Sequence, residues 1–187
     1  MTMNAVKVFK DKEKFFLPWS YDYRSRIYPI PAFLTPQDTD FGKSLLKFHE
    51  SDFVTPEAEH WLAFQVATTY GLDKDTMKDR QIWVSQNHDL ITRVATDPIG
   101  NLPDWEGADE PWQFLAAAEE YYACVITCSR QFTNLMVATD ATCSGLQILS
   151  GLARDKSTAK LVNVVPSDKP QDAYKTVAEA CYNDIPD

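Results

Sequence analysis

The sequence lacks three features that would each indicate a class of protein. It has no apolar run long enough to cross a bilayer, no amino-terminal signal peptide, and no internal repeat or low-complexity segment. These absences argue against a membrane-spanning chain, a secreted domain and a repeat array. The four cysteines are then expected to be free thiols in a reducing cytosol. We expect a soluble, cytoplasmic protein with no membrane partner.

Metal-ligating side chains are also scarce. The three histidines, His49, His60 and His88, are scattered along the chain. Cys124 and Cys128 are spaced to share one helical face, which could indicate a metal site, but no further cysteine or histidine pair completes four ligands. Free cysteines more often pack in a core. We therefore favour packing over metal binding for these two thiols.

The chain has no overall excess of positive charge. Its formal net charge is −9, which argues against a simple nucleic-acid-binding module because contact with phosphates requires cationic surface. The charge is unevenly distributed, however: residues 48–120 hold 15 acidic and 4 basic residues, whereas residues 1–47 hold 8 basic and 5 acidic. Residues 121–187 hold 6 basic and 7 acidic residues. This pattern predicts a solvent-facing acidic segment in the middle and two ends, near neutral or basic, that a polyanion could contact.

An apolar run ends at a single carboxylate near the carboxyl-terminal third of the chain. Residues 135–138 are apolar, and Asp140 is followed by small polar residues that lead to Ser144 and Gly145. The run predicts a buried strand, and a carboxylate where such a strand emerges could hold a hard cation such as Mg²⁺. The alternative is a turn or helix cap, which an aspartate in this position forms more often. From spacing alone, the cap is the favoured interpretation.

Other segments have clearer secondary-structure signals. Residues 1–14 predict a loose arm or an edge strand, and residues 15–33 predict extended or hairpin structure because they are aromatic, β-branched and rich in proline. Arg24 and Arg26 would then share one strand face, where they could clamp phosphates or form ordinary surface. Further on, we expect helices at 55–71, 75–95, from 110, at 144–154 and at 170–182, and a strand at 161–165. The aromatic residues of the helix that begins near residue 110 could stack bases, but their helical spacing favours core packing.

Three blocks in this order resemble one family. They are Asp22-Tyr23-Arg24-Ser25-Arg26, the stretch from Asp140 to Ile148, and Val162-Asn163-Val164-Val165-Pro166-Ser167 followed by Gln171-Asp172-Ala173-Tyr174. Together they resemble the palm of the single-subunit RNA polymerases of bacteriophages and mitochondria, and the phage enzymes most closely. The first block is similar to the family's D-x-x-G-R motif, and the second is similar to its D-G-S-C-S-G-x-Q-H motif.

The resemblance implies a fold. It is a helix-rich α+β fold, the palm core of a right-hand polymerase with a small antiparallel sheet flanked by helices. All of residues 1–187 would form a single partial palm domain. Within it, residues 1–14 would be the loose arm, 15–47 the arginine-motif strands, 48–130 the helical wall, and 131–187 the metal-aspartate strand with its following helices.

The resemblance also implies an activity, DNA-directed RNA synthesis by two-metal nucleotidyl transfer. The partners would be a DNA template, the RNA product and nucleoside triphosphates, with Mg²⁺ as cofactor and the host cytoplasm as location if a phage encodes the chain. Asp140 would be the catalytic, metal-binding carboxylate. The other roles would be Mg²⁺ ligation by the Ala141 carbonyl, nucleic-acid contacts at Arg24, Arg26, Lys43, Ser144 and Gly145, and nucleotide binding at Tyr174.

The sequence departs from the family pattern at several positions. Ser25 stands where the family has glycine, Ala141 and Thr142 replace Gly-Ser, and Ile148 replaces histidine. A second metal aspartate and a nucleotide-binding lysine are not found, so a second chain or a missing segment would supply them and the chain alone would be inactive. A non-catalytic remnant or interaction protein that retains the palm fold is the alternative. A related DNA polymerase or reverse transcriptase is less favoured, since those palms do not usually carry the Cys-Ser-Gly-x-Gln sequence or the upstream arginine motif.

Overall fold

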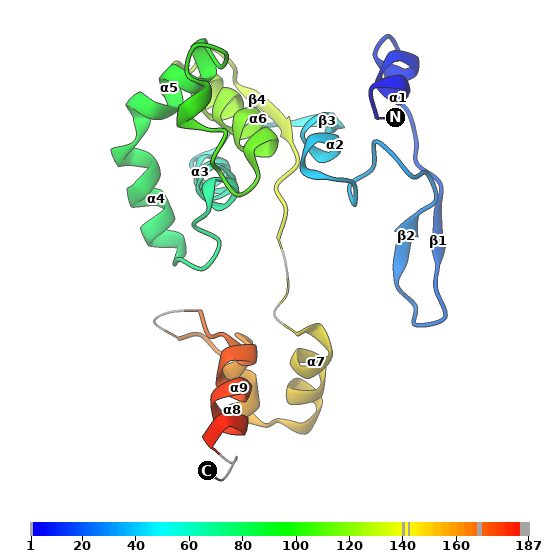
Figure 1. Ribbon diagram of the computed structural model, residues 1–187, viewed down its shortest axis with the longest axis vertical. Helices are drawn as coiled ribbons and strands as arrows, with labels where there is room; N and C mark the ends of the chain where they lie inside the picture. Colours follow the sequence, from blue (N-terminus) through cyan, green and yellow to red (C-terminus); the bar gives the residue numbers. More distant parts are fainter. Residues whose placement is uncertain (1, 140, 142, 168–169, 184–187) are drawn as a thin grey trace. The chain divides into compact units, whose positions relative to one another are not determined.

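The computed structural model describes residues 2–139, 141, 143–167 and 170–183. The chain divides into two compact units, residues 1–73 with 77–137 and residues 74–76 with 138–187 (Figure 1). Helices predominate, and the described strands form two antiparallel two-stranded sheets, β1–β2 and β3–β4. The expectation of a helix-rich α+β chain is confirmed at this level. The assignment of residues 1–187 to one partial domain stays a prediction.

Four helices build the core of the first unit. They are α3 (Pro56–Tyr70), α4 (Met77–Gln86), α5 (His88–Thr96) and α6 (Pro111–Tyr121), the last continued by a π-helical turn, η2 (Tyr122–Ile126). The predicted ends of α3 are confirmed: the Thr55 hydroxyl accepts from the Ala58 amide, and Gly71 ends the helix at φ 136°. Fully buried side chains on all four helices meet between them, namely Val66, Val84, Ile91, Val94 and Phe114. The aromatic helix α6 therefore packs in the core, as its spacing predicted.

The single helix expected at 75–95 is wrong, because α4 and α5 are separated at Asn87. The Asn87 backbone leaves the helical region at φ −112° and ψ 23°, and its side-chain amide donates to the Trp83 carbonyl at 2.8 Å. Asparagine side chains compete in this way for backbone acceptors that a continuing helix would use. The periodicity of apolar residues runs through the break and does not reveal it.

The sheet of β3 (Lys47–Phe53) and β4 (Phe132–Leu135) corrects two further expectations. The segment predicted as helical wall from residue 48 begins as a strand, and the strand predicted to lead up to Asp140 ends at Leu135. Lys47 pairs with Leu135, and the chain before Lys47 turns into the short helix α2 (Asp40–Ser44). A strand beyond Leu135 therefore has no partner in β3, so the apolar residues that follow do not extend the ladder.

Glu120 joins this sheet to α6. Its carboxylate is 1% exposed and accepts from Lys47 Nζ at 2.8 Å, Arg130 Nη1 at 2.6 Å and Thr133 Oγ1 at 2.8 Å. Lys47 begins β3, Arg130 precedes β4 and Thr133 lies within β4. A buried carboxylate is tolerated only when it is paired and hydrogen-bonded, and here its partners come from both strands.

The amino-terminal residues form a helix and a hairpin. Thr2–Phe9 is α1, so the edge strand considered there is wrong, whereas the loose arm of residues 1–14 stays a prediction. The helix has no buried residue, and the Phe9 and Phe15 rings lie 4.8 Å apart. The hairpin expected in residues 15–33 is confirmed as β1 (Trp19–Tyr21) paired with β2 (Ile27–Pro29).

Residues 22–26 form the turn of this hairpin. The Ser25 amide donates to the Asp22 carbonyl at 3.0 Å, and the Asp22 amide donates to the Arg26 carbonyl at 2.9 Å. Asp22 Oδ1 also accepts from the amides of Arg24, at 2.7 Å, and Arg26, at 3.0 Å. Ser25 has φ 61°, the left-handed conformation that a three-residue hairpin loop requires after its first turn. Arg24 therefore lies in a turn, and the prediction that Arg24 and Arg26 share a strand face is wrong.

The second unit holds α7 (Ser144–Ala153), α8 (Lys156–Leu161) and α9 (Ala173–Asn183). The helices expected at 144–154 and 170–182 are confirmed, but the strand expected at 161–165 is wrong. Asp155 starts α8 by accepting from the Ser157 and Thr158 amides, and hydrogen bonds from Thr158 and Ser157 lower the pKa of Asp155 to about 2. This cap directs residues 156–161 into a helix despite the apolar residues that follow.

We expect Glu120→Gln to destabilise the chain by about 1–3 kcal/mol, because the charged hydrogen bonds from Lys47 and Arg130 lose their anionic acceptor. Urea unfolding at neutral pH measures the effect. Glu119→Gln is the matched control, since Glu119 is exposed on the same helix, and it should change stability by less than about 0.5 kcal/mol. Equal stabilities for the two variants would contradict the role given to Glu120.

The stabilisation that Glu120 provides should depend on pH. Burial is the largest influence on the pKa of Glu120 and raises it, but the hydrogen bonds from Lys47 and Thr133, with the charges of Lys47 and Arg130, together hold that pKa below 4.5. A carboxyl group whose pKa is lower in the folded state than in the unfolded state stabilises the fold at any pH above the unfolded-state pKa. This stabilisation is lost as the pH falls through the folded-state pKa. The stability difference between wild type and Glu120→Gln should therefore shrink as the pH falls below 4.5 in a series of urea curves. A difference that persists in acid would count against the ion pairs.

Glycine at position 25 should stabilise the turn. The β-carbon of Ser25 disfavours φ 61°, so Ser25→Gly removes strain and should slow hydrogen exchange of the Asp22 amide by about threefold. Ser25→Val, whose branched side chain fits this conformation worse, should accelerate that exchange. Identical exchange rates of the Asp22 amide in the two variants would show that the left-handed conformation of residue 25 does not limit the stability of the turn.

Candidate functional site

Asp140, the first candidate for chemistry, lies outside the described residues, as does Thr142. Its assignment as a metal ligand therefore stays a prediction. The described neighbour Ala141 is exposed, and Cys143 has φ 54° and directly precedes α7. Among the described residues, no group of three or more histidine, cysteine, aspartate or glutamate side chains could hold a metal ion.

Ser144 and Gly145 form the first turn of α7, and both are exposed. Cys143, the residue that caps the helix, makes no side-chain hydrogen bond to that turn. A β-carbon built on Gly145 would meet nothing within 4 Å, so neither packing nor a positive φ requires glycine here. The first amides of a helix attract anionic oxygens, and a residue without a side chain lets such a ligand approach the backbone.

The hairpin turn presents two guanidinium groups beside one carboxylate. Arg24 Nε lies 3.2 Å from Asp22 Oδ2, and the guanidinium carbon of Arg24 lies 5.4 Å from the centre of the Tyr23 ring. Arg26 is exposed, and its backbone amide is the largest cause that lowers the pKa of Asp22. Asp22 therefore stays ionised and shapes the turn, while the side chain of Arg26 extends into solvent.

The remaining predicted residues lie on separate elements. Lys43 is half-buried in the last turn of α2, and the Asp40 carboxylate at the start of that helix accepts from the Trp112 and Gln113 amides, which fixes α2 against α6. Arg24 and Arg26 lie in the turn of the β1–β2 hairpin, so the three predicted cations come from two separate elements. Tyr174 is 72% exposed in the first turn of α9, in the same unit as α7.

The two cysteines considered as metal ligands differ in their surroundings. Cys124 is buried in the helical core, as expected for a packing residue, and burial raises the pKa of its thiol. Cys128 is exposed, and its sulfur donates to the Val125 carbonyl at 3.5 Å. Packing therefore explains Cys124 and does not explain Cys128.

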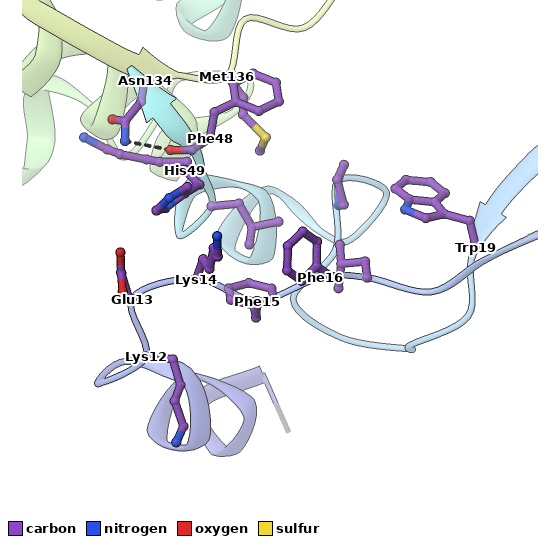
Figure 2. A pocket seen from close by; sticks show the side chains of 14 residues that line it. Lys12, Glu13, Lys14, Phe15, Phe16, Trp19, Phe48, His49, Asn134 and Met136 are labelled. Carbon is purple, nitrogen blue, oxygen red and sulfur yellow. Dashed lines mark hydrogen bonds between the residues drawn. The ribbon is translucent and has the colours of Figure 1, made fainter.

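Sequence reasoning missed a cavity of about 510 Å³ in the first unit. It lies between residues 12–19, on the amino-terminal side of the hairpin, and the start of β3 (Figure 2). Lysine and aromatic side chains line it from both segments. The signal in the sequence was the mixture of lysine and phenylalanine in residues 12–16, which we divided between a polar arm that ends at residue 14 and extended structure that begins at residue 15.

In the described ranges, no helix combines the length and apolarity that a membrane span requires.

Comparison with known proteins identifies relatives over almost all of the chain. Residues 54–186 match the family of DNA-dependent RNA polymerases. The chain is 30% identical to the mitochondrial DNA-directed RNA polymerase of Neurospora crassa over 187 residues, which are 99% of this chain and 13% of the relative. It is 34% identical to the mitochondrial enzyme of Schizosaccharomyces pombe over 169 residues, 89% of this chain and 15% of the relative. The T7 RNA polymerase of Escherichia phage T7 is 32% identical over 177 residues, 95% of this chain and 20% of the relative.

These matches cover most of this chain, but the chain spans only 13–20% of the length of these relatives. The family match alone extends over most of the sequence and includes the segment from Asp140 to Ile148. We conclude that the chain belongs to the family of DNA-dependent RNA polymerases, in its phage and mitochondrial branch.

Proposed function

We propose that this chain forms part of the palm of a single-subunit DNA-directed RNA polymerase and contributes to template-directed nucleotidyl transfer. The observation that carries the proposal is the exposed start of α7, whose first turn has no side-chain cap and which begins four residues after Asp140 in the segment that matches the polymerase family. Open helix amides suit phosphate oxygens, and a carboxylate so near in the sequence could supply a ligand for a cation that meets them.

In this proposal, Asp140 and the Ala141 carbonyl hold Mg²⁺. Their oxygens are donors of the kind that Mg²⁺ takes, and a site with one or two carboxylates is completed by substrate phosphates and water. The donor set therefore fits the ion, although one carboxylate would bind it weakly. When bound, Mg²⁺ would neutralise charge on the triphosphate and make the RNA 3′-hydroxyl a better nucleophile.

The other residues would position the substrates. Arg24 and Arg26 would contact the backbone of the template or of the RNA–DNA hybrid, and Lys43 would add a further phosphate contact. The first amides of α7, at Ser144 and Gly145, would receive the primer end or a nucleotide phosphate. The exposed ring of Tyr174 would line the nucleotide site.

The proposal requires groups that lie in other parts of a polymerase. Since the chain spans 13–20% of the length of its relatives, the second metal aspartate and the nucleotide-binding lysine would come from a further segment or from a second chain. On this view the chain alone binds its ligands weakly and does not polymerise.

The test replaces Asp140 in an assembled enzyme. A chimera in which this chain substitutes for the matched region of T7 RNA polymerase should extend RNA on a DNA template, and Asp140→Asn should lower the rate by more than about 100-fold. The amide keeps the volume of the carboxylate but removes the charge that holds Mg²⁺. Single-nucleotide addition under saturating triphosphate measures the rate.

Asp155→Asn is the matched control. It makes the same chemical change at an exposed aspartate that caps α8, and asparagine is also a good cap, so addition should be unchanged. Unchanged addition by Asp140→Asn would contradict the catalytic role. A folded chimera that adds no nucleotide would favour a non-catalytic remnant of the palm.

A further inference from the structure

The cavity between residues 12–19 and β3 combines positive charge with aromatic surface. Residues 12–17, Trp19 and Pro36 line it from one side, and residues 46–49 with Asn134 and Met136 line it from the other. In Figure 2, Lys14 and Phe16 lie across the cavity from Phe48 and His49. Its volume of about 510 Å³ lies within the range of pockets that hold small organic ligands.

The charge in the cavity is mainly positive. Lys12, Lys14 and Lys47 line it together with His49, against the single carboxylate of Glu13. Lys47 is engaged by the buried Glu120, but no ion pair is recorded for Lys12 or Lys14 in the ranges that the structure describes. In Figure 2, the Lys12 side chain extends away from the other labelled residues, so the unpaired ammonium group at the opening is that of Lys14. A chain with a net charge of −9 thus keeps an exposed cation at this opening, which favours the approach of a polyanion.

Three aromatic side chains line the same cavity and are open to solvent. Phe16 is 84% exposed, Phe48 60% and Trp19 46%. The ammonium group of Lys14 lies 5.9 Å from the centre of the Phe16 ring, so charge and aromatic face are presented together. Flat apolar surface beside cationic groups suits nucleic acid, whose bases stack on aromatic rings while phosphates contact the charges.

The β3 wall of the cavity is held in place by the rest of the fold. Asn134 on β4 donates through its side chain to the Phe48 carbonyl at 2.7 Å, and Lys47 is bound to Glu120. Leu46, which also lines the cavity, is 8% exposed. Phe48 is therefore presented from a paired strand, and this rigid backing lowers the entropy lost when a base stacks on it.

We propose that this cavity binds a single-stranded segment of nucleic acid, with bases stacked on Phe16, Trp19 and Phe48 and a phosphate beside Lys14. A purely apolar ligand would leave the Lys14 ammonium group unpaired, and a compact anion would leave the aromatic faces exposed. The inference rests on the proposed function, because the bound strand would be one that the polymerase site handles. It adds a second contact region, on residues for which we predicted no role.

The experiment measures fluorescence anisotropy of short labelled oligo(dT) and oligo(U) titrated with the full 187-residue chain over a range of salt concentrations. The variant Lys14→Gln should flatten the slope of log affinity against log salt by about 0.7, the amount that one lost phosphate contact on a single strand removes. The double variant Phe16→Ala, Phe48→Ala should weaken binding by roughly tenfold or more with little change in the salt slope. Comparison of the two oligonucleotides shows whether the strand is DNA or RNA.

Matched controls lie outside the cavity. Phe53→Ala truncates an exposed phenylalanine at the other end of β3, and Lys78→Gln neutralises an exposed lysine on α4, so neither should alter binding. Circular dichroism verifies that each variant is folded. Equal affinities for the cavity variants and the controls, or no oligonucleotide binding by the folded chain, would overturn this inference. Neither result would decide the proposed function, which depends on nucleotide addition by the Asp140 variants.

Discussion

A buried carboxylate organises the strand from which the chain continues toward Asp140. Glu120 is 1% exposed, and its oxygens accept hydrogen bonds from Lys47 at the beginning of β3, from Arg130 two residues before β4, and from Thr133 within β4. Two short strands with an irregular register would form a weak sheet by themselves. Because the Glu120 charge must be compensated, the surrounding structure has to bring Lys47 and Arg130 to it, and this requirement sets how β3 and β4 lie against α6. The same requirement fixes Lys47 and Phe48 as one wall of the cavity.

The arginine motif has an equally local explanation. Asp22 accepts from two amides of its own turn, and position 25 takes a left-handed conformation. Glycine, which the family motif has at this position, adopts that conformation without strain, whereas serine requires its β-carbon to be tolerated. The spacing of aspartate, glycine and arginine in the motif thus describes a three-residue hairpin loop, and the arginines are displayed because the loop ends a hairpin. Any chemical role of the motif therefore requires the hairpin loop to form first, because the loop positions the arginines that would contact a ligand.

The sequence predicted the elements whose signals are local. Thr55 with Pro56 and Gly71 bound α3 because a cap, a proline and a glycine act within one turn. The wrong predictions have two causes: a strand partner that is absent, or one polar side chain whose local hydrogen bond overrides the apolar pattern. β4 ends at Leu135 because β3 offers no pairing beyond Lys47, and residues 161–165 are no strand because Asp155 starts a helix before them. For the candidate site, motif matching indicated residues one by one. The turn that carries Arg24 follows from local hydrogen bonds of Asp22, and the cavity beside β3 follows from tertiary contacts; apolar periodicity encodes neither.

Charge is distributed unevenly over the elements of the chain, so that some of them attract a polyanion and others repel it. Most of the acidic excess lies in residues 48–120, which include α3, α4 and α5, and so a polyanion is repelled from the outer faces of those helices. Positive groups remain on the hairpin turn, on α2 and at the cavity near residues 12–19. A nucleic acid that is attracted to some elements and repelled by others can bind in only a few orientations. Attraction alone would restrict it less, since like-charge contacts raise the free energy of the incorrect orientations. The net negative charge is therefore compatible with nucleic-acid binding, because the acidic excess lies mainly in residues 48–120 and leaves these basic elements outside it.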